Sequence, residues 1–213
     1  MKQTMMDDAS LRRLMKAIAS ADGAAVLGLL TAFPALARAT LKKGATRAAA
    51  TDNFLNEIKH YVYTGDTALH VAAAAHRPEI ARELISLGAD VAARNRRGAT
   101  PLHYAADGIP GSPRWNPVPQ SVTVALLIAS GADPNAIDQN GVTPLHRAVR
   151  TRCGAAASAL LDGGADALRK NGNGSTPMML ATRQTGRGGS GSPEARTQQA
   201  EIIRLLERYG MTP

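Results

Sequence analysis

The sequence predicts an all-α repeat protein, a solenoid in which short helix pairs stack along one axis. Four similar segments carry this prediction: TALHVAA begins at Thr67, TPLHYAA at Thr100, TPLHRAV at Thr143 and TPMMLAT at Thr176. The spacings between these threonines are 33, 43 and 33 residues, so one period of 33 residues governs the chain. Aromatic residues make up only 3% of the sequence, which fits helices packed closely through small side chains.

Each repeat is expected to hold two short helices and an extended finger. The threonine is a good N-cap, and the proline that follows it in three of the four copies suits the first helical turn. The second helix carries a bulky apolar face, as in Leu84 and Leu87, and ends at the glycine of a Gly-Ala-Asp sequence. The finger then runs through turn-forming residues such as those at 138–141.

This pattern resembles the ankyrin repeat family, whose signature is TPLHxAA at a 33-residue period. The resemblance covers roughly residues 65–210 and implies an all-α ankyrin repeat solenoid of helix-turn-helix pairs with β-turn fingers. Leu205 and Leu206 are expected to seal the C-terminal end. The expected divisions are a degenerate N-terminal capping helix pair in 1–40, an insertion in 41–66, and repeats in 67–99, 100–142, 143–175 and 176–213.

The first insertion, residues 41–66, is expected to contain an extra helix. Asp52 can cap such a helix, and apolar residues follow it on one stripe. Those residues are Phe54, Leu55, Ile58, Tyr61 and Val62. This helix either covers the first finger or serves as a dedicated docking element for a partner.

The second insertion, residues 107–120, lies within the second full repeat and holds the only tryptophan, Trp115. Four prolines stiffen it. A rigid loop that carries a tryptophan is a candidate binding hot spot, but an amphipathic indole also packs back onto its own protein. Both readings of Trp115 remain open at this point.

The third insertion, residues 184–198, is rich in Gly and Ser and is expected to be a flexible loop. Its glycines Gly186, Gly188 and Gly191 match the spacing G-x-G-x-x-G. The dinucleotide-binding fingerprint needs a strand before that motif, whereas a helix is expected here. We therefore expect no cofactor.

No residue pattern points to catalysis or metal binding, and we expect a protein that is not an enzyme. Three of the five histidines are the fourth residue of the repeat motif, where they are expected to hydrogen-bond neighbouring backbone. The single cysteine, Cys153, excludes a disulfide framework and a multi-cysteine metal site. It follows the first helix of the third repeat, where an exposed, incidental thiol is expected.

The ankyrin resemblance implies a protein-binding surface formed by the finger tips and the exposed residues of the first helices. Carried over position by position, with the Trp115 loop as a second contact, the candidate residues are Arg94, Arg96, Arg97, Trp115, Gln139, Asn140, Arg150, Lys170 and Arg183. Most of these are cationic. Asp107 is expected to be the one counter-charge at the rim, because Asp138 takes a position that serves turn structure.

The chain carries 25 Lys and Arg against 17 Asp and Glu, which gives a net charge of +8. With the basic positions above, this predicts a partner that is acidic at the contact surface, either a protein or a peptide. The alternatives are a solvated basic surface, nucleic acid, and an enzyme whose pocket is built from the insertions. Nucleic acid is disfavoured because the candidate face lacks stacking aromatics and a protruding helix.

The chain has no uninterrupted apolar stretch long enough to span a membrane. Residues 24–39 imitate a secretory signal, but acidic residues precede them and the capping helix pair explains the same apolar pattern. We expect a monomer in a reducing cytoplasm. A preference for Arg over Lys and an abundance of Ala suggest a bacterial source.

Overall fold

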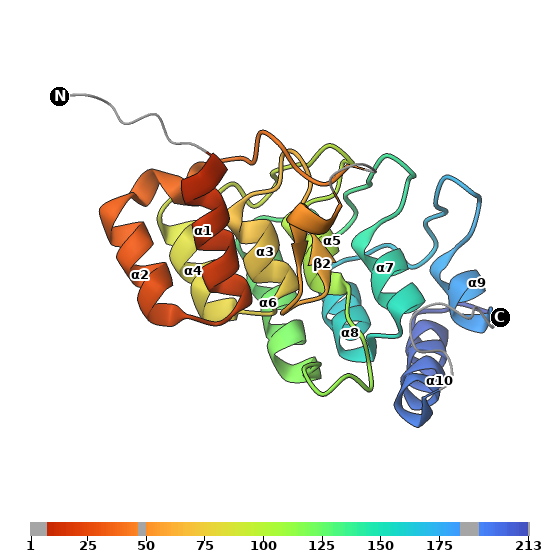
Figure 1. The fold of residues 1–213 in the computed structure, drawn as a ribbon. Helices are drawn as coiled ribbons and strands as arrows, with labels where there is room; N and C mark the ends of the chain where they lie inside the picture. Colours follow the sequence, from red (N-terminus) through yellow and green to blue (C-terminus); the bar gives the residue numbers. More distant parts are fainter. Residues whose placement is uncertain (1–7, 47–49, 184–191, 213) are drawn as a thin grey trace.

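The computed structural model describes residues 8–46, 50–183 and 192–212. Ten α-helices follow one another within these residues and cross the molecule in chain order (Figure 1). The helices are α1 (Asp8–Ala19), α2 (Gly23–Ala32), α3 (Ala68–Ala74), α4 (Pro78–Ser86), α5 (Pro101–Ala106), α6 (Pro117–Ala129), α7 (Pro144–Thr151), α8 (Gly154–Asp162), α9 (Pro177–Thr182) and α10 (Pro193–Arg208). Two 3-10 helices, η1 (Pro34–Arg38) and η2 (Thr51–Asn53), complete the helical elements.

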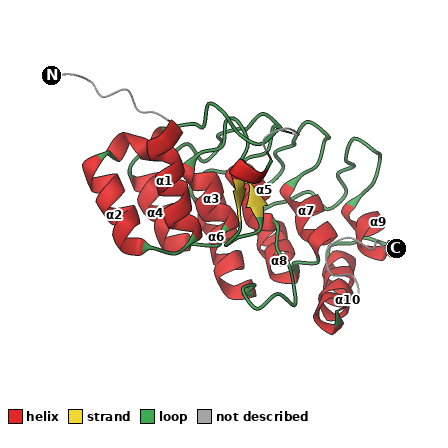
Figure 2. Ribbon diagram, viewed as in Figure 1, coloured by secondary structure: helices red, strands yellow, loops and turns green. Residues whose placement is uncertain are grey.

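The helices form two rows. The first helices of the pairs contact one another in the order α1, α3, α5, α7 and α9, and the second helices α4, α6, α8 and α10 do the same. Loops join the helices of neighbouring repeats on one side of the molecule, as the loop colouring in Figure 2 shows. This arrangement confirms the all-α solenoid that the repeats predict. No described helix is both long and apolar enough to cross a membrane.

The repeat histidines tie each repeat to the next. His70 Nε2 donates to the carbonyl of Ala99 at 3.1 Å, and its Nδ1 accepts from the backbone N–H of Thr67 at 3.2 Å. His103 and His146 repeat both bonds one and two repeats later. The expectation that these histidines bond backbone is therefore confirmed.

The fingers are held by one polar residue each and by one another. Asp138 Oδ1 accepts from the N–H groups of Asn140 and Val142, at 2.8 and 3.1 Å. Asn95 and Asn171 make the same turn in the fingers on either side. Consecutive fingers are joined by backbone bonds, such as the bond from Gln139 N–H to the Arg97 carbonyl at 2.9 Å.

The Gly-Ala-Asp glycines close the second helices as expected. Gly88, Gly131 and Gly164 adopt φ values of +86°, +96° and +92°, which favour glycine. At the C-terminal end of the stack, Leu206 is completely buried and Leu205 is 6% exposed. The last helix therefore shields the preceding repeat from solvent.

In the described part of the first insertion, residues 41–46 and 50–66, the expected extra α-helix is absent, and a small β-hairpin takes its place. Strand β1 (Phe54–Leu55) pairs antiparallel with β2 (His60–Tyr61), and the Phe54 and Tyr61 rings contact each other with centroids 4.6 Å apart. Lys59 has a φ of 53°, a left-handed conformation that a helix does not contain. The apolar stripe suited a helix, but so short a pattern also fits two strands and a turn.

The second insertion is part loop and part helix, because α6 begins at Pro117 inside it. Asn116 caps this helix by accepting from the N–H of Val118 at 3.0 Å. In the third insertion α10 begins at Pro193. Residues 184–191, which include the three glycines of the G-x-G-x-x-G spacing, lie outside the described residues.

Candidate functional site

The hairpin and the segment after it pack against α5 and against the finger that precedes it. The His60 ring packs on the Tyr104 ring of α5, with centroids 4.3 Å apart. The guanidinium groups of Arg96 and Arg97 lie 5.4 and 5.1 Å from the centre of the Tyr63 ring. The hairpin therefore contributes residues to the lining of each of the cavities described below.

A cavity of about 210 Å³ gathers three of the candidate residues predicted from the sequence. Arg97 comes from a finger, Asn140 from the next finger and Arg150 from the end of α7. Lys59 of the hairpin adds a fourth polar group that the sequence did not single out. In all, four cationic and two acidic side chains line this basic cavity.

Both acidic groups of the basic cavity already contact Arg147. Its guanidinium lies 3.1 Å from Asp107 and 3.2 Å from Asp138. Burial alone would lower the pKa of Arg147, but the two carboxylates outweigh burial and raise it. The pKa of Asp138 is lowered, because backbone N–H bonds and Arg147 outweigh the opposing effect of burial.

Asp107 also faces Arg150, at 3.8 Å from its guanidinium. Asp107, the carboxylate expected at the rim, is thus present, but it also forms an ion pair with the buried Arg147. Sequence reasoning missed Arg147, although a signal existed. The other repeats carry Val71, Tyr104 and Leu180 at this position, so an arginine here replaces an apolar or aromatic side chain.

A second buried network joins the hairpin segment to the second full repeat. Tyr104 donates its hydroxyl to Asp66 Oδ2 at 2.9 Å, and Asn95 donates to Asp66 Oδ1 at 2.8 Å. Burial raises the pKa of Tyr104, and the neighbouring Asp66 raises it further. Burial also lowers the pKa of His60 and His76, so both imidazoles favour the neutral form.

Two of the finger arginines have structural contacts. Arg94 donates to the carbonyl of Ile137 at 2.7 Å and to that of Gly98 at 3.2 Å, which braces the next finger. Arg96 donates to the carbonyl of Ala45 in the first insertion. These two side chains hold loops together, whereas Arg97 also lines the basic cavity.

The remaining candidates lie elsewhere. Gln139, Lys170 and Arg183 are exposed, and none of the three lines the basic cavity. Gln139 is a neighbour of that cavity through the backbone bond from its N–H to the Arg97 carbonyl. The candidate surface predicted from the sequence is therefore divided between one cavity and outlying positions.

Trp115 is half-buried and is held in place by its own protein. Its indole N–H donates to Gln120 Oε1 at 3.0 Å, and Gln120 Nε2 donates to the carbonyl of Ala105 at 3.1 Å. A Cβ atom on Gly108 would lie 2.7 Å from the Cys153 sulfur and 3.0 Å from the indole nitrogen. The loop therefore packs against α8 without space for a larger residue.

Cys153 is not exposed, contrary to the sequence-based expectation. Its exposed fraction is 0%, because the 107–116 loop covers the turn between α7 and α8. Burial raises the pKa of its thiol to about 11. A buried thiol with a raised pKa is a poor nucleophile.

A larger cavity of about 730 Å³ lies between the hairpin and the 107–116 loop. Its lining combines Trp115, Tyr104, His60 and His76 with cationic side chains from several elements. The two insertions meet at its edge, where Arg114 donates to the carbonyl of Glu57 at 2.7 Å. We refer to it as the insertion cavity.

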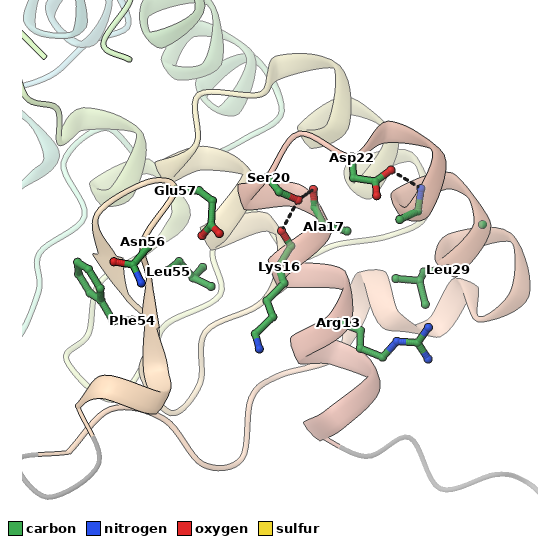
Figure 3. Close-up of a pocket in the computed structure, with 12 residues that line it drawn as sticks. Arg13, Lys16, Ala17, Ser20, Asp22, Leu29, Phe54, Leu55, Asn56 and Glu57 are labelled. Atoms are coloured by element: carbon green, nitrogen blue, oxygen red, sulfur yellow. Dashed lines mark hydrogen bonds between the residues drawn. The ribbon is translucent and has the colours of Figure 1, made fainter. Parts of the chain in front are cut away.

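A third cavity, of about 790 Å³, lies between α1, the start of α2 and the hairpin (Figure 3). Arg13 and Lys16 extend from α1 on one side, and Phe54 and Glu57 belong to the hairpin on the other. Sequence reasoning did not select these residues, because the helix expected at 52–62 gave no reason to place them beside α1. Within the described residues, no group of His, Cys, Asp and Glu side chains could hold a metal ion.

The repeat geometry agrees with the comparison against protein families. The family model described as "Ankyrin repeats (3 copies)" matches residues 14–112 and 119–209, and a single "Ankyrin repeat" model matches residues 97–139. The chain belongs to the ankyrin repeat family. Ankyrin repeats are generally protein-protein interaction modules, so the cavities on the concave side are candidate contact surfaces for a protein.

Among curated proteins, the chain is similar to the mitochondrial disaggregase of Rattus norvegicus. The two are 43% identical over 58 residues, which is 27% of this chain and 9% of the disaggregase. The chain therefore matches only a small part of that relative. The similarity therefore assigns no disaggregase activity to this ankyrin protein.

Proposed function

We propose that this ankyrin repeat protein is a non-enzymatic, monomeric binding module that captures an acidic segment of a partner protein on its basic concave side. The supporting observation is the basic cavity, in which Arg97 and Arg150 lie together with Lys59. Arg147 engages both carboxylates there, Asp107 lies a further 3.8 Å from Arg150, and Lys59 and Arg97 form no ion pair among the described residues. The cations of this cavity can therefore take an incoming carboxylate. Clustered cations on a concave surface favour an acidic partner and speed its association.

The preformed geometry suits recognition of an extended segment. Arg97 is held against Tyr63 by a hydrogen bond from its guanidinium to the phenol oxygen at 3.0 Å. Arg150 is anchored weakly, since its side chain is 54% exposed. One fixed and one adaptable arginine can each form charge-assisted bonds with successive carboxylates. A reducing cytoplasm is the location we propose, in line with the single buried thiol.

The test is selection of peptides from a random display library, followed by fluorescence anisotropy of the enriched peptides. We expect acidic peptides to be enriched and to bind more weakly as salt rises. An Arg97→Glu/Arg150→Glu variant should lose roughly tenfold or more in affinity. The matched control is Arg196→Glu/Arg204→Glu, which makes the same charge change on exposed positions of α10.

Two outcomes would overturn the proposal. One is enrichment of peptides without acidic bias, or equal loss of binding in the variant and in the control. The other is tighter, salt-dependent binding of a labelled DNA duplex that the Arg97→Glu/Arg150→Glu change abolishes, which would assign the basic side to nucleic acid. Circular dichroism melting of each variant establishes that the repeats remain folded.

A further inference from the structure

We propose that the insertion cavity, which adjoins the basic cavity and shares Lys59 and Arg150 with it, is a second binding site, for a small molecule that has a planar aromatic ring with an N–H group and a carboxylate. This site goes beyond the proposed capture of an acidic protein segment. Its volume of about 730 Å³ falls in the range of small-molecule pockets in proteins. Repeats alone do not form it, because the hairpin and the 107–116 loop both supply residues to its lining.

The aromatic walls are fixed before any ligand arrives. The indole of Trp115 is bonded to the fully buried Gln120, which in turn holds the carbonyl end of α5. The His60 ring, which also lines the cavity, packs on Tyr104. Rigid rings in the lining favour a planar ligand, because little conformational entropy is lost on binding.

The lining of the cavity is basic. Four cationic and two acidic side chains line it, and the cations are Lys59, Arg77, Arg114 and Arg150. Arg114 is committed to the Glu57 carbonyl and holds the two insertions together. Arg77 lies at the turn before α4, lines the cavity and forms no ion pair among the described residues. This unpaired cation favours a carboxylate on the ligand.

Asp107 also lines this cavity and carries an unpaired acceptor. Asp107 Oδ1 is buried and accepts no hydrogen bond among the described residues, with the Arg150 guanidinium 3.8 Å away. A buried carboxylate oxygen without a donor destabilises the protein until a donor reaches it. An N–H on the ligand ring would supply that donor. Three features of the lining define the ligand class. The ligand supplies an N–H donor to Asp107, a carboxylate to Arg77 and a planar ring to the aromatic side chains.

The probes are indole-3-acetate, its neutral amide indole-3-acetamide, and naphthalene-1-acetate, which keeps the carboxylate but lacks the ring N–H. The reporter is the indole N–H signal of Trp115 in the two-dimensional nitrogen-15 spectrum, because the chain has a single tryptophan. We expect indole-3-acetate to shift this signal saturably. Both analogues should bind roughly tenfold more weakly, since each leaves one buried polar group unpaired.

The variant Arg77→Gln should remove the preference for the acid over the amide. Its control is Arg82→Gln, which makes the same change on an exposed position of α4 and should bind as the wild type does. The inference is overturned by equal affinity for acid and amide, by an unchanged preference in Arg77→Gln, or by no shift at millimolar probe. Arg77 plays no part in the peptide test, so the two proposals fail independently.

Discussion

Among single residues, Arg147 is predicted to have a large effect on stability. It is 9% exposed and contacts the carboxylates of Asp107 and Asp138. Replacing it by Met leaves two largely buried carboxylates without their common partner, so we expect the free energy of unfolding to fall by about 3 kcal/mol. Urea unfolding at neutral pH measures this change.

The control for Arg147→Met is Arg204→Met on α10, where the side chain is exposed and the change should stay within about 0.5 kcal/mol. A loss in Arg147→Met no larger than that of the control would show that the cluster contributes nothing to folding. An added Asp107→Asn change should recover part of the loss, because it removes one of the uncompensated charges.

The buried repeat histidines predict destabilisation in acid. The pKa of His103 is lowered from 6.5 to about 4, chiefly by burial and next by Arg147. The unfolded state therefore takes up a proton at higher pH than the folded state does. The free energy of unfolding should be greatest above about pH 6.5 and should decline toward about pH 4, by about 3 kcal/mol from this group.

Urea unfolding at several pH values between about 7.5 and 4.5 tests this direction. Burial lowers the pKa of His70 and His146 as well, so they add to the same decline. A His103→Gln variant should show a shallower dependence on pH than the wild type. If the free energy of unfolding depended on pH equally in both proteins, protonation of His103 would not be a cause of the acid destabilisation.

At the scale of elements, the hairpin and the 107–116 loop support each other through the bond from Arg114 to the Glu57 carbonyl. Arg114→Ala should speed hydrogen exchange in residues 54–61 roughly fivefold, which corresponds to about 1 kcal/mol for one lost bond. Exchange in α8 should stay unchanged. Mass spectrometry of peptic fragments measures this, and Arg82→Ala on α4 is the control. Unchanged exchange in the hairpin would contradict the bracing role.

Most of the helical elements could be predicted because their signals are local. The capping threonine, the helix-starting proline and the helix-ending glycine stand at fixed offsets within 33 residues. The hairpin could not be predicted, since its position depends on contacts with Tyr104 and Arg114, more than 40 residues further along the chain. A five-residue apolar stripe does not distinguish a helix from two paired strands.

The candidate site could be predicted only in part, because long-range contacts decide which of its residues come together. The family positions led to Arg97, Asn140 and Arg150, which do line one cavity. They also led to Arg94 and Arg96, whose partners in other loops no local pattern reveals. The insertion cavity could not be predicted, because two insertions line it and no pattern in the sequence shows that they lie next to each other.

For the whole molecule, helix pairs that contact mainly their neighbours predict that the ends can unfold first. Leu206 on α10 is completely buried, and Leu206→Ala should cost about 3 kcal/mol, mostly in the last repeat. In this variant, the loss of helical ellipticity should begin at a lower urea concentration than the change in Trp115 fluorescence. Leu102→Ala, in the central α5, should keep the two transitions together. Coincident transitions in both variants would contradict independent fraying.

Because the first insertion contacts more than one repeat, the repeats of this chain cannot be removed or exchanged independently. Residues of 41–66 contact the repeat at 67–99 and also reach beyond it to Tyr104 and Arg114 of the next repeat. Removing or exchanging the 67–99 repeat would therefore displace the hairpin from its supports and open the insertion cavity. In recombination between related arrays, the segment from 41 to 142 would be inherited as one block.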